Sequence, residues 1–126
     1  MAWLARSVIT LLLGISLFAC SKPEPFLPPP NFQADATLGR QIYQQHCAVC
    51  HGQNLRGNAL KGPPLINEVY RPDHHADLAF YQAVRSGVLQ HHWHFGNMPT
   101  QPDVTPEMTG HVVAYVRQEQ RNAGIF

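Results

Sequence analysis

Apolar residues recur with helical spacing along residues 34–45. Their spacings of four and one place the side chains on one face of a helix: Leu38, Ile42 and Tyr43. Asp35 or Thr37 is suited to the N-cap, because either side chain can accept a hydrogen bond from a backbone amide of the first turn. Gly39 lies inside the segment and costs about 1 kcal/mol relative to alanine unless another element packs closely there. The pattern predicts a first helix.

Two further segments have a helical pattern. Residues 74–86 have a second apolar stripe followed by Gly87, which suits the position after a helix: Leu78, Phe80, Tyr81 and Val84. The tripeptide at residues 105–107, Thr-Pro-Glu, is typical of a helix start. Thr can cap the first turn, Pro fits the first helical position, and the negative charge of Glu is stabilised by the positive N-terminal end of the helix dipole. One mostly apolar face then follows: Met108, Val112, Tyr115, Val116 and Glu119. The pattern therefore predicts a second and a third helix.

No segment alternates between apolar and polar residues as a strand does, so the predicted fold is all-α. The loops between the helices, residues 52–71 and 88–104, are long for a compact domain. Three short helices in about ninety residues make a thin core. A large apolar ligand inside the domain would complete the packing.

The first twenty residues have the pattern of an export signal. Arg6 precedes an apolar run over residues 8–18 that is too short to span a bilayer of about 30 Å comfortably. The sequence LFAC at residues 17–20 resembles the lipobox of bacterial lipoproteins, which implies cleavage after residue 19 and lipidation of Cys20. An ordinary signal peptide or an uncleaved anchor, with Cys20 incidental, is the alternative.

Proline dominates the segment that follows the signal. Five of the residues 21–33 are proline, which lacks an amide hydrogen and does not fit a helix interior or a central strand. Such a stretch is expected to form a semi-rigid, polyproline-type spacer. The predicted organisation is therefore a signal peptide at 1–19, a tether at 20–33 and one folded domain at 34–126.

Charge and cysteine content exclude some classes of protein. The net charge of +1 gives no broad basic face, so a nucleic-acid binder is not expected. Three cysteines, two of them only three positions apart, do not make a disulfide-stapled scaffold. Residues 34–126 contain seven Lys/Arg and seven Asp/Glu, and Lys61 is the single lysine among them. Docking by a ring of lysines is therefore not expected.

The strongest chemical signal is Cys47-x-x-Cys50-His51, which is the attachment signature of c-type haem. The two cysteines add to the haem vinyl groups, and the adjacent histidine ligates the iron. A structural zinc site would need further ligands, which only the histidine clusters could supply. A thioredoxin-like dithiol is expected at the start of a helix in a βαβ unit, whereas this motif follows a helix.

Residues 34–126 resemble a class I monohaem cytochrome c. The resemblance rests on GRQIYQQHCAVCHG, on AYV at residues 114–116 and on GPPL at residues 62–65. It implies an all-α fold of three or more short helices and long loops wrapped around one covalent haem c. Gly39 and Tyr43 would pack the first helix against the last. The carbonyl of Pro63 would accept the Nδ1 hydrogen of His51, which orients the ring and raises its basicity.

The resemblance also implies a second axial ligand, a methionine in the loop before the last helix. Met98 has this position, in FGNMPT, while Met108 fits the buried stripe of the last helix. Ligation by histidine and methionine raises the reduction potential and leaves no open position on the iron, as suits an electron carrier.

Eight histidines are unusual for a chain of this length, and five lie in two clusters: His74, His75, His91, His92 and His94. One interpretation places them at the surface around the haem crevice. A second builds a secondary copper or zinc site from His91, His92 and His94, with or without the other pair. Docking of a partner, a response to pH and ligation of the haem iron remain open. Trp93 would cover the haem edge or lie at a docking surface.

The resulting functional expectation is a one-electron carrier, not an enzyme, between redox proteins at the periplasmic side of the cell envelope. A lipid on Cys20 would attach it to the inner or outer membrane. The alternatives are a haem enzyme or ligand sensor with a displaceable Met98, and a copper-handling cytochrome that uses the His-rich segments.

Overall fold

The computed structural model describes residues 24–126, so the predicted signal peptide at 1–19 and Cys20 lie outside the described residues. The described chain forms four α-helices and one 3₁₀ helix: α1 (Ala36–His46), α2 (Ala48–His51), η1 (Glu68–Tyr70), α3 (Asp77–Ser86) and α4 (Pro106–Asn122). Residues 24–126 contain isolated β-bridges but no strand, which confirms the all-α prediction. No helix in this part of the chain has the length and apolar character needed to cross a membrane.

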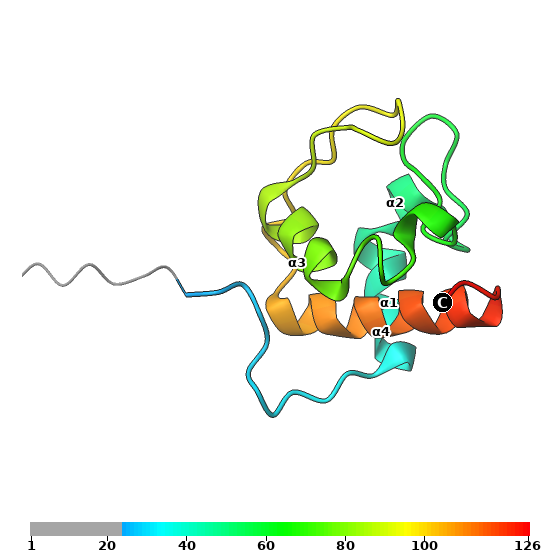
Figure 1. Ribbon diagram of the computed structural model, residues 1–126. Helices are drawn as coiled ribbons and strands as arrows, with labels where there is room; N and C mark the ends of the chain where they lie inside the picture. The colour runs from blue at the N-terminus through cyan, green and yellow to red at the C-terminus, as the bar shows by residue number, and fades with distance from the viewer. Residues whose placement is uncertain (1–23) are drawn as a thin grey trace, which may run out of the picture.

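The two longest helices, α1 and α4, cross each other, and α2 and α3 lie on the same side of α4 (Figure 1). They cross at Gly39, where a Cβ atom would lie 1.9 Å from the carbonyl oxygen of His111. The rings of Tyr43 and Tyr115 pack beside this crossing with centroids 5.6 Å apart. Glycine is therefore needed at position 39 of α1, because any side chain there would collide with the backbone of α4.

The ends of the helices follow the predicted caps in most cases. The Asp35 carboxylate accepts hydrogen bonds from the amides of Thr37 and Leu38, so Asp35 is the N-cap of α1 and Thr37 is not. Thr105 caps α4 through the amide of Met108, and a proline occupies its first turn as predicted. Gly87 ends α3 with a φ of 72°, a conformation that glycine adopts without strain.

The prediction that the second helix begins at His74 is wrong. The amides of His74 and His75 both reach back to the carbonyl of Arg71 in a turn, and α3 begins only at Asp77. The carbonyl of His75 accepts a hydrogen bond from the Arg117 guanidinium of α4, so it is not used within a helix. A tertiary contact thus accompanies a helix start three residues later than the predicted one, and the apolar stripe from Leu78 onward still lies within α3.

The proline-rich segment does not remain separate from the domain over its whole length. The ring of Phe32 packs edge-on against His111 at 4.8 Å between centroids, and it also lies over Gly110. The amide of Asp35 donates to Nδ1 of His111 at 2.9 Å. Contact with α4 therefore begins two residues before the predicted domain boundary at residue 34.

Candidate functional site

The Cys-x-x-Cys-His segment forms the single turn α2 directly after α1. The amide of Cys47 still donates to the Tyr43 carbonyl at 2.9 Å, and the amide of His51 donates to the Cys47 carbonyl at 2.9 Å. The hydroxyl of Tyr43 donates to the carbonyl of Gly52 at 2.6 Å, which ties the end of this turn to α1. One helical turn thus presents Cys47, Cys50 and His51 from a rigid support. Periodicity could not have revealed it, because four residues are too few.

The GPPL loop lies tightly against this turn. A Cβ atom on Gly62 would lie 2.8 Å from the carbonyl oxygen of Cys50, so only glycine permits the approach. Nδ1 of His51 donates to the Pro63 carbonyl at 2.9 Å. Burial lowers the pKa of His51, and the bond to Pro63 offsets part of that effect. The imidazole is therefore neutral and oriented, with Nε2 available as a metal ligand.

The environment of Cys47 does not suit a redox dithiol. Burial, and secondly the neighbouring Cys50, raise the pKa of the Cys47 thiol to about 11. Catalytic dithiols need the opposite change, because the thiolate is the nucleophile. The residues described also supply no zinc cage for these cysteines, since the one cluster of metal-ligating side chains found among them contains only histidines. A thiol that adds covalently to a cofactor fits this environment better.

A largely apolar cavity of about 810 Å³ opens beside the turn. Cavities of about 300–1,000 Å³ are typical of cofactor sites. Cys47, Cys50, His51 and Pro63 line one part of it, and Met98 is also in its wall. The backbone of Met98 pairs with that of Val88 through two hydrogen bonds of 2.9 and 3.0 Å. This bridge closes the loop over residues 89–97 and holds Met98 at the cavity.

The cavity wall contains a polar atom that suits a haem. The indole Nε1 of Trp93 is buried and has no hydrogen-bond partner among the residues that the structure describes. Trp93 lines the cavity together with Tyr70; burial raises the pKa of the Tyr70 phenol, and the nearby indole N–H of Trp93 offsets part of that effect. An indole N–H can only donate, and the haem carboxylates are acceptors of the kind it requires. The lining therefore fits a group that is apolar over most of its surface and anionic at one edge.

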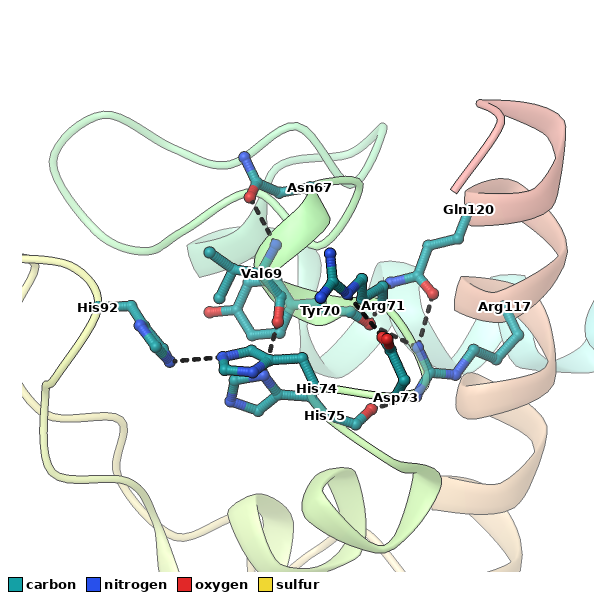
Figure 2. A network of polar contacts seen from close by, with 10 residues as sticks. All are labelled: Asn67, Val69, Tyr70, Arg71, Asp73, His74, His75, His92, Arg117 and Gln120. Carbon is teal, nitrogen blue, oxygen red and sulfur yellow. Dashed lines mark hydrogen bonds and ion pairs between the residues drawn. The ribbon is translucent and has the colours of Figure 1, made fainter. Parts of the chain in front are cut away.

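A polar network anchored on α4 supports one side of this cavity (Figure 2). The Arg117 side chain is only 8% exposed and donates to the Tyr70 carbonyl at 2.6 Å, to the Gln120 side chain at 2.7 Å and to Asp77 at 2.8 Å. Gln120, which is 1% exposed, donates to the Leu65 carbonyl at 2.8 Å. These contacts fix the segment that leads from GPPL to α3.

Sequence reasoning did not identify Arg117 and Gln120. A signal for them existed, because they lie four and seven positions after buried Val113 and therefore share its face of α4. Polar residues at core positions of an amphipathic helix indicate buried partners, here the backbone carbonyls of the loop.

The two histidine-rich segments meet in space, but the residues that come together differ from the expected set of His91, His92 and His94. His74, His75 and His92 bring one ring nitrogen each within 4.8 Å of one another. The ring of His91 lies 4.4 Å from that of His92 between centroids, while His94 is not part of the group. Partial desolvation, and then the neighbouring rings of His91, His75 and His74, lower the pKa of His92.

Comparison with known families gives an independent result. The family model described as Cytochrome c matches residues 36–120, from the start of α1 almost to the end of α4. The match includes the Cys-x-x-Cys-His turn, the GPPL loop and Met98. No solved structure matches.

Three relatives are redox proteins. The chain is 33% identical over 63 residues to a cytochrome c-553-like protein of Synechocystis, covering 49% of this chain and 58% of the relative. It is 27% identical over 90 residues to the cbb3-type cytochrome c oxidase subunit CcoP of Rhodobacter capsulatus, covering 69% of this chain and 30% of that one. A thiosulfate dehydrogenase of Stutzerimonas stutzeri is 42% identical over 45 residues, which is 32% of this chain and 15% of the relative.

The chain spans less than two thirds of the length of each of these relatives, so the comparison concerns the haem domain and not the activity of the whole relatives. Together, the family match, the helical fold and the paired cysteines followed by histidine agree on one cofactor, covalently bound haem c. The chain belongs to the cytochrome c family, as an electron-transfer protein of the class I monohaem type.

Proposed function

We propose that this protein is a one-electron carrier whose haem iron is held by His51 and Met98. The observation that carries the proposal is that Cys47, Cys50, His51 and Met98 line a single cavity although Met98 is 47 positions away from the motif. The haem supplies the one-electron chemistry. Cys47 and Cys50 would attach the group, the Pro63 carbonyl orients His51, and the closed loop holds Met98 at the cavity.

Ligation of the haem iron by both His51 and Met98 would favour electron transfer over catalysis. Nε2 of His51 is free because Nδ1 is engaged with the Pro63 carbonyl, and the short bridge between Val88 and Met98 restrains the loop that carries the second ligand. If His51 and Met98 both ligated the iron, little would rearrange when an electron enters or leaves. Trp93 is the residue best suited to donate a hydrogen bond to a haem carboxylate.

Visible absorption spectra of the oxidised and reduced protein, followed by exposure of the reduced form to carbon monoxide, test the axial pair. The native protein is expected to show covalent six-coordinate haem and to resist carbon monoxide, whereas Met98→Ala should bind it readily. Met108→Leu is the matched control, because Met108 packs against the core cluster and should leave the spectrum unchanged. Ready binding by the native protein would favour the alternative of a ligand sensor or haem enzyme.

We also propose that the carrier works between redox proteins at the periplasmic side of the envelope, attached through a lipid on Cys20. The support is the signal-like N-terminus and the lipobox-like LFAC. Radiolabelled palmitate should enter the wild-type protein and not Cys20→Ser, and the variant should move from the membrane to the soluble periplasmic fraction. Equal labelling of both proteins would contradict the anchor. The relatives named as an oxidase subunit and a thiosulfate dehydrogenase suggest partners of the same redox class.

A further inference from the structure

The two histidine-rich segments meet at the edge of the haem cavity. His74 and His75 belong to the turn before α3, and His92 belongs to the loop over residues 89–97; Figure 2 shows the rings of His74 and His92 pointing toward each other. These residues are not needed for the haem attachment described above. We propose that His74, His75 and His92 form a second metal site, which binds a divalent transition-metal ion and prefers Cu²⁺.

The spacing of the first two ligands matches a metal site. Nε2 of His74 and Nε2 of His92 are 3.4 Å apart. Two nitrogens bound to one tetrahedral ion at about 2.0–2.1 Å are themselves separated by about 3.3–3.4 Å. The two ring nitrogens are therefore already close enough to bind one ion, and a closing movement of about 0.5 Å would give the separation of about 2.9 Å between adjacent ligands of a square-planar Cu²⁺ site. His75 belongs to the same group, in which one ring nitrogen of each histidine lies within 4.8 Å of the others.

The third ligand is held in a binding orientation. Nδ1 of His75 donates to the Val69 carbonyl at 2.6 Å, so its Nε2 carries the free lone pair. The Arg117 guanidinium donates one hydrogen bond to the His75 carbonyl and another to the Tyr70 carbonyl. Backbone and ring are thus fixed from two sides. His91 lies outside this group of three, although its ring is 4.4 Å from that of His92 between centroids and its Nδ1 donates to the Leu89 carbonyl at 2.9 Å.

The available donors determine which metal fits. The two carboxylates nearest in sequence are already paired, Asp73 with Arg71 at 2.6 Å and Asp77 with Arg117 at 2.8 Å. An all-imidazole donor set is unsuited to Mg²⁺ and Ca²⁺, which take oxygen ligands, and suits Cu²⁺ or Zn²⁺. Among divalent ions of the first transition series, Cu²⁺ binds such a nitrogen set most tightly.

Equilibrium dialysis of the oxidised, haem-loaded protein against Cu²⁺, with Zn²⁺ and Mg²⁺ in parallel, tests the site. We expect one tightly bound Cu²⁺ per chain, weaker Zn²⁺ binding and no Mg²⁺ binding. His74→Ala and His92→Ala should each weaken Cu²⁺ binding at least tenfold. His94→Ala is the matched control, since it removes a histidine from the same loop but outside the group, and its affinity should stay within twofold of the wild type.

Electron paramagnetic resonance of bound Cu²⁺ gives a second measurement, with nitrogen couplings that decrease in number in His92→Ala. The proposal is overturned if no stoichiometric Cu²⁺ binds, if both alanine variants bind like the wild type, or if His94→Ala loses as much affinity as His92→Ala. The visible haem spectrum should be the same in all variants. Failure of this test would leave the electron-carrier function intact, since the haem ligands are not altered.

Discussion

Replacing Gly39 with alanine tests the crossing of α1 and α4 most directly. The added Cβ would lie 1.9 Å from the carbonyl oxygen of His111 and 2.5 Å from its carbonyl carbon. Real Cβ contacts are essentially never shorter than 3.0 Å, so the helices must separate locally by about 1.1 Å. Both contacting atoms belong to the backbone of α4, and no side-chain rotation can move them away.

Two opposing effects set the magnitude. Alanine favours the helical conformation by about 1 kcal/mol relative to glycine. Overpacking costs about 1–3 kcal/mol, and the upper end applies here because the neighbour is backbone. The expected net loss in the free energy of unfolding is therefore about 2 kcal/mol, equivalent to a fall of about 8–16 °C in Tm for a domain of this size.

The assay is guanidinium chloride unfolding of the haem-loaded protein, followed by the circular dichroism of its helices. Gly110→Ala is the matched control, because it adds the same atom to a helix whose nearest neighbours are the ends of the Phe32 and Tyr81 side chains. Those rings can move, so the control should lose less than about 1 kcal/mol. The reasoning is refuted if Gly39→Ala is as stable as the wild type or more stable than Gly110→Ala.

Three other outcomes are expected. Trp93→Phe keeps an aromatic ring but removes the indole N–H, so a haem carboxylate loses its donor and the midpoint potential measured by spectroelectrochemistry should fall; an unchanged potential argues against that contact. Arg117→Met removes the hydrogen bonds of a side chain that is only 8% exposed, and it should lower the free energy of unfolding by about 3 kcal/mol. Arg71→Ala removes an exposed ion pair and should lower it by less than about 1 kcal/mol, so equal losses would contradict the role of burial. Because residues 34–126 carry equal numbers of acidic and basic side chains, electron-transfer rates with a partner should change little with salt, and a steep decline in stopped-flow experiments would show electrostatic steering instead.

Most of the residues expected to bind haem could be predicted from the local sequence. The Cys-x-x-Cys-His spacing is a covalent requirement of the cofactor, so it appears in consecutive residues wherever the chain folds. The caps of α1 and α4 were also predictable, because a capping side chain bonds to amides only two or three residues away. The bond from His51 to the Pro63 carbonyl was expected from the resemblance of GPPL to its family, and the structure shows it at 2.9 Å.

The sequence did not reveal two sets of contacts between distant segments. The predicted start of the second helix at residue 74 was wrong because Arg117, 42 positions after His75, takes the carbonyl of that residue. The composition of the histidine cluster likewise depended on the path of two loops. His94 is adjacent to the cluster in sequence, yet His74 is 18 positions from His92 and shares a hydrogen bond with it.

The sequence by itself therefore determined the cofactor, the helical class of the fold and the kind of residue that caps α1 and α4, since each depends on residues close together in the chain. Only the tertiary structure decided that Phe32 contacts α4, that Arg117 and Gln120 anchor the loop beside the haem cavity, and that His92 meets His74 and His75. The physical reason is common to all three. Each is a pairing between segments far apart in sequence, and the position of one segment relative to the other is set by packing around the α1–α4 crossing, not by local propensity.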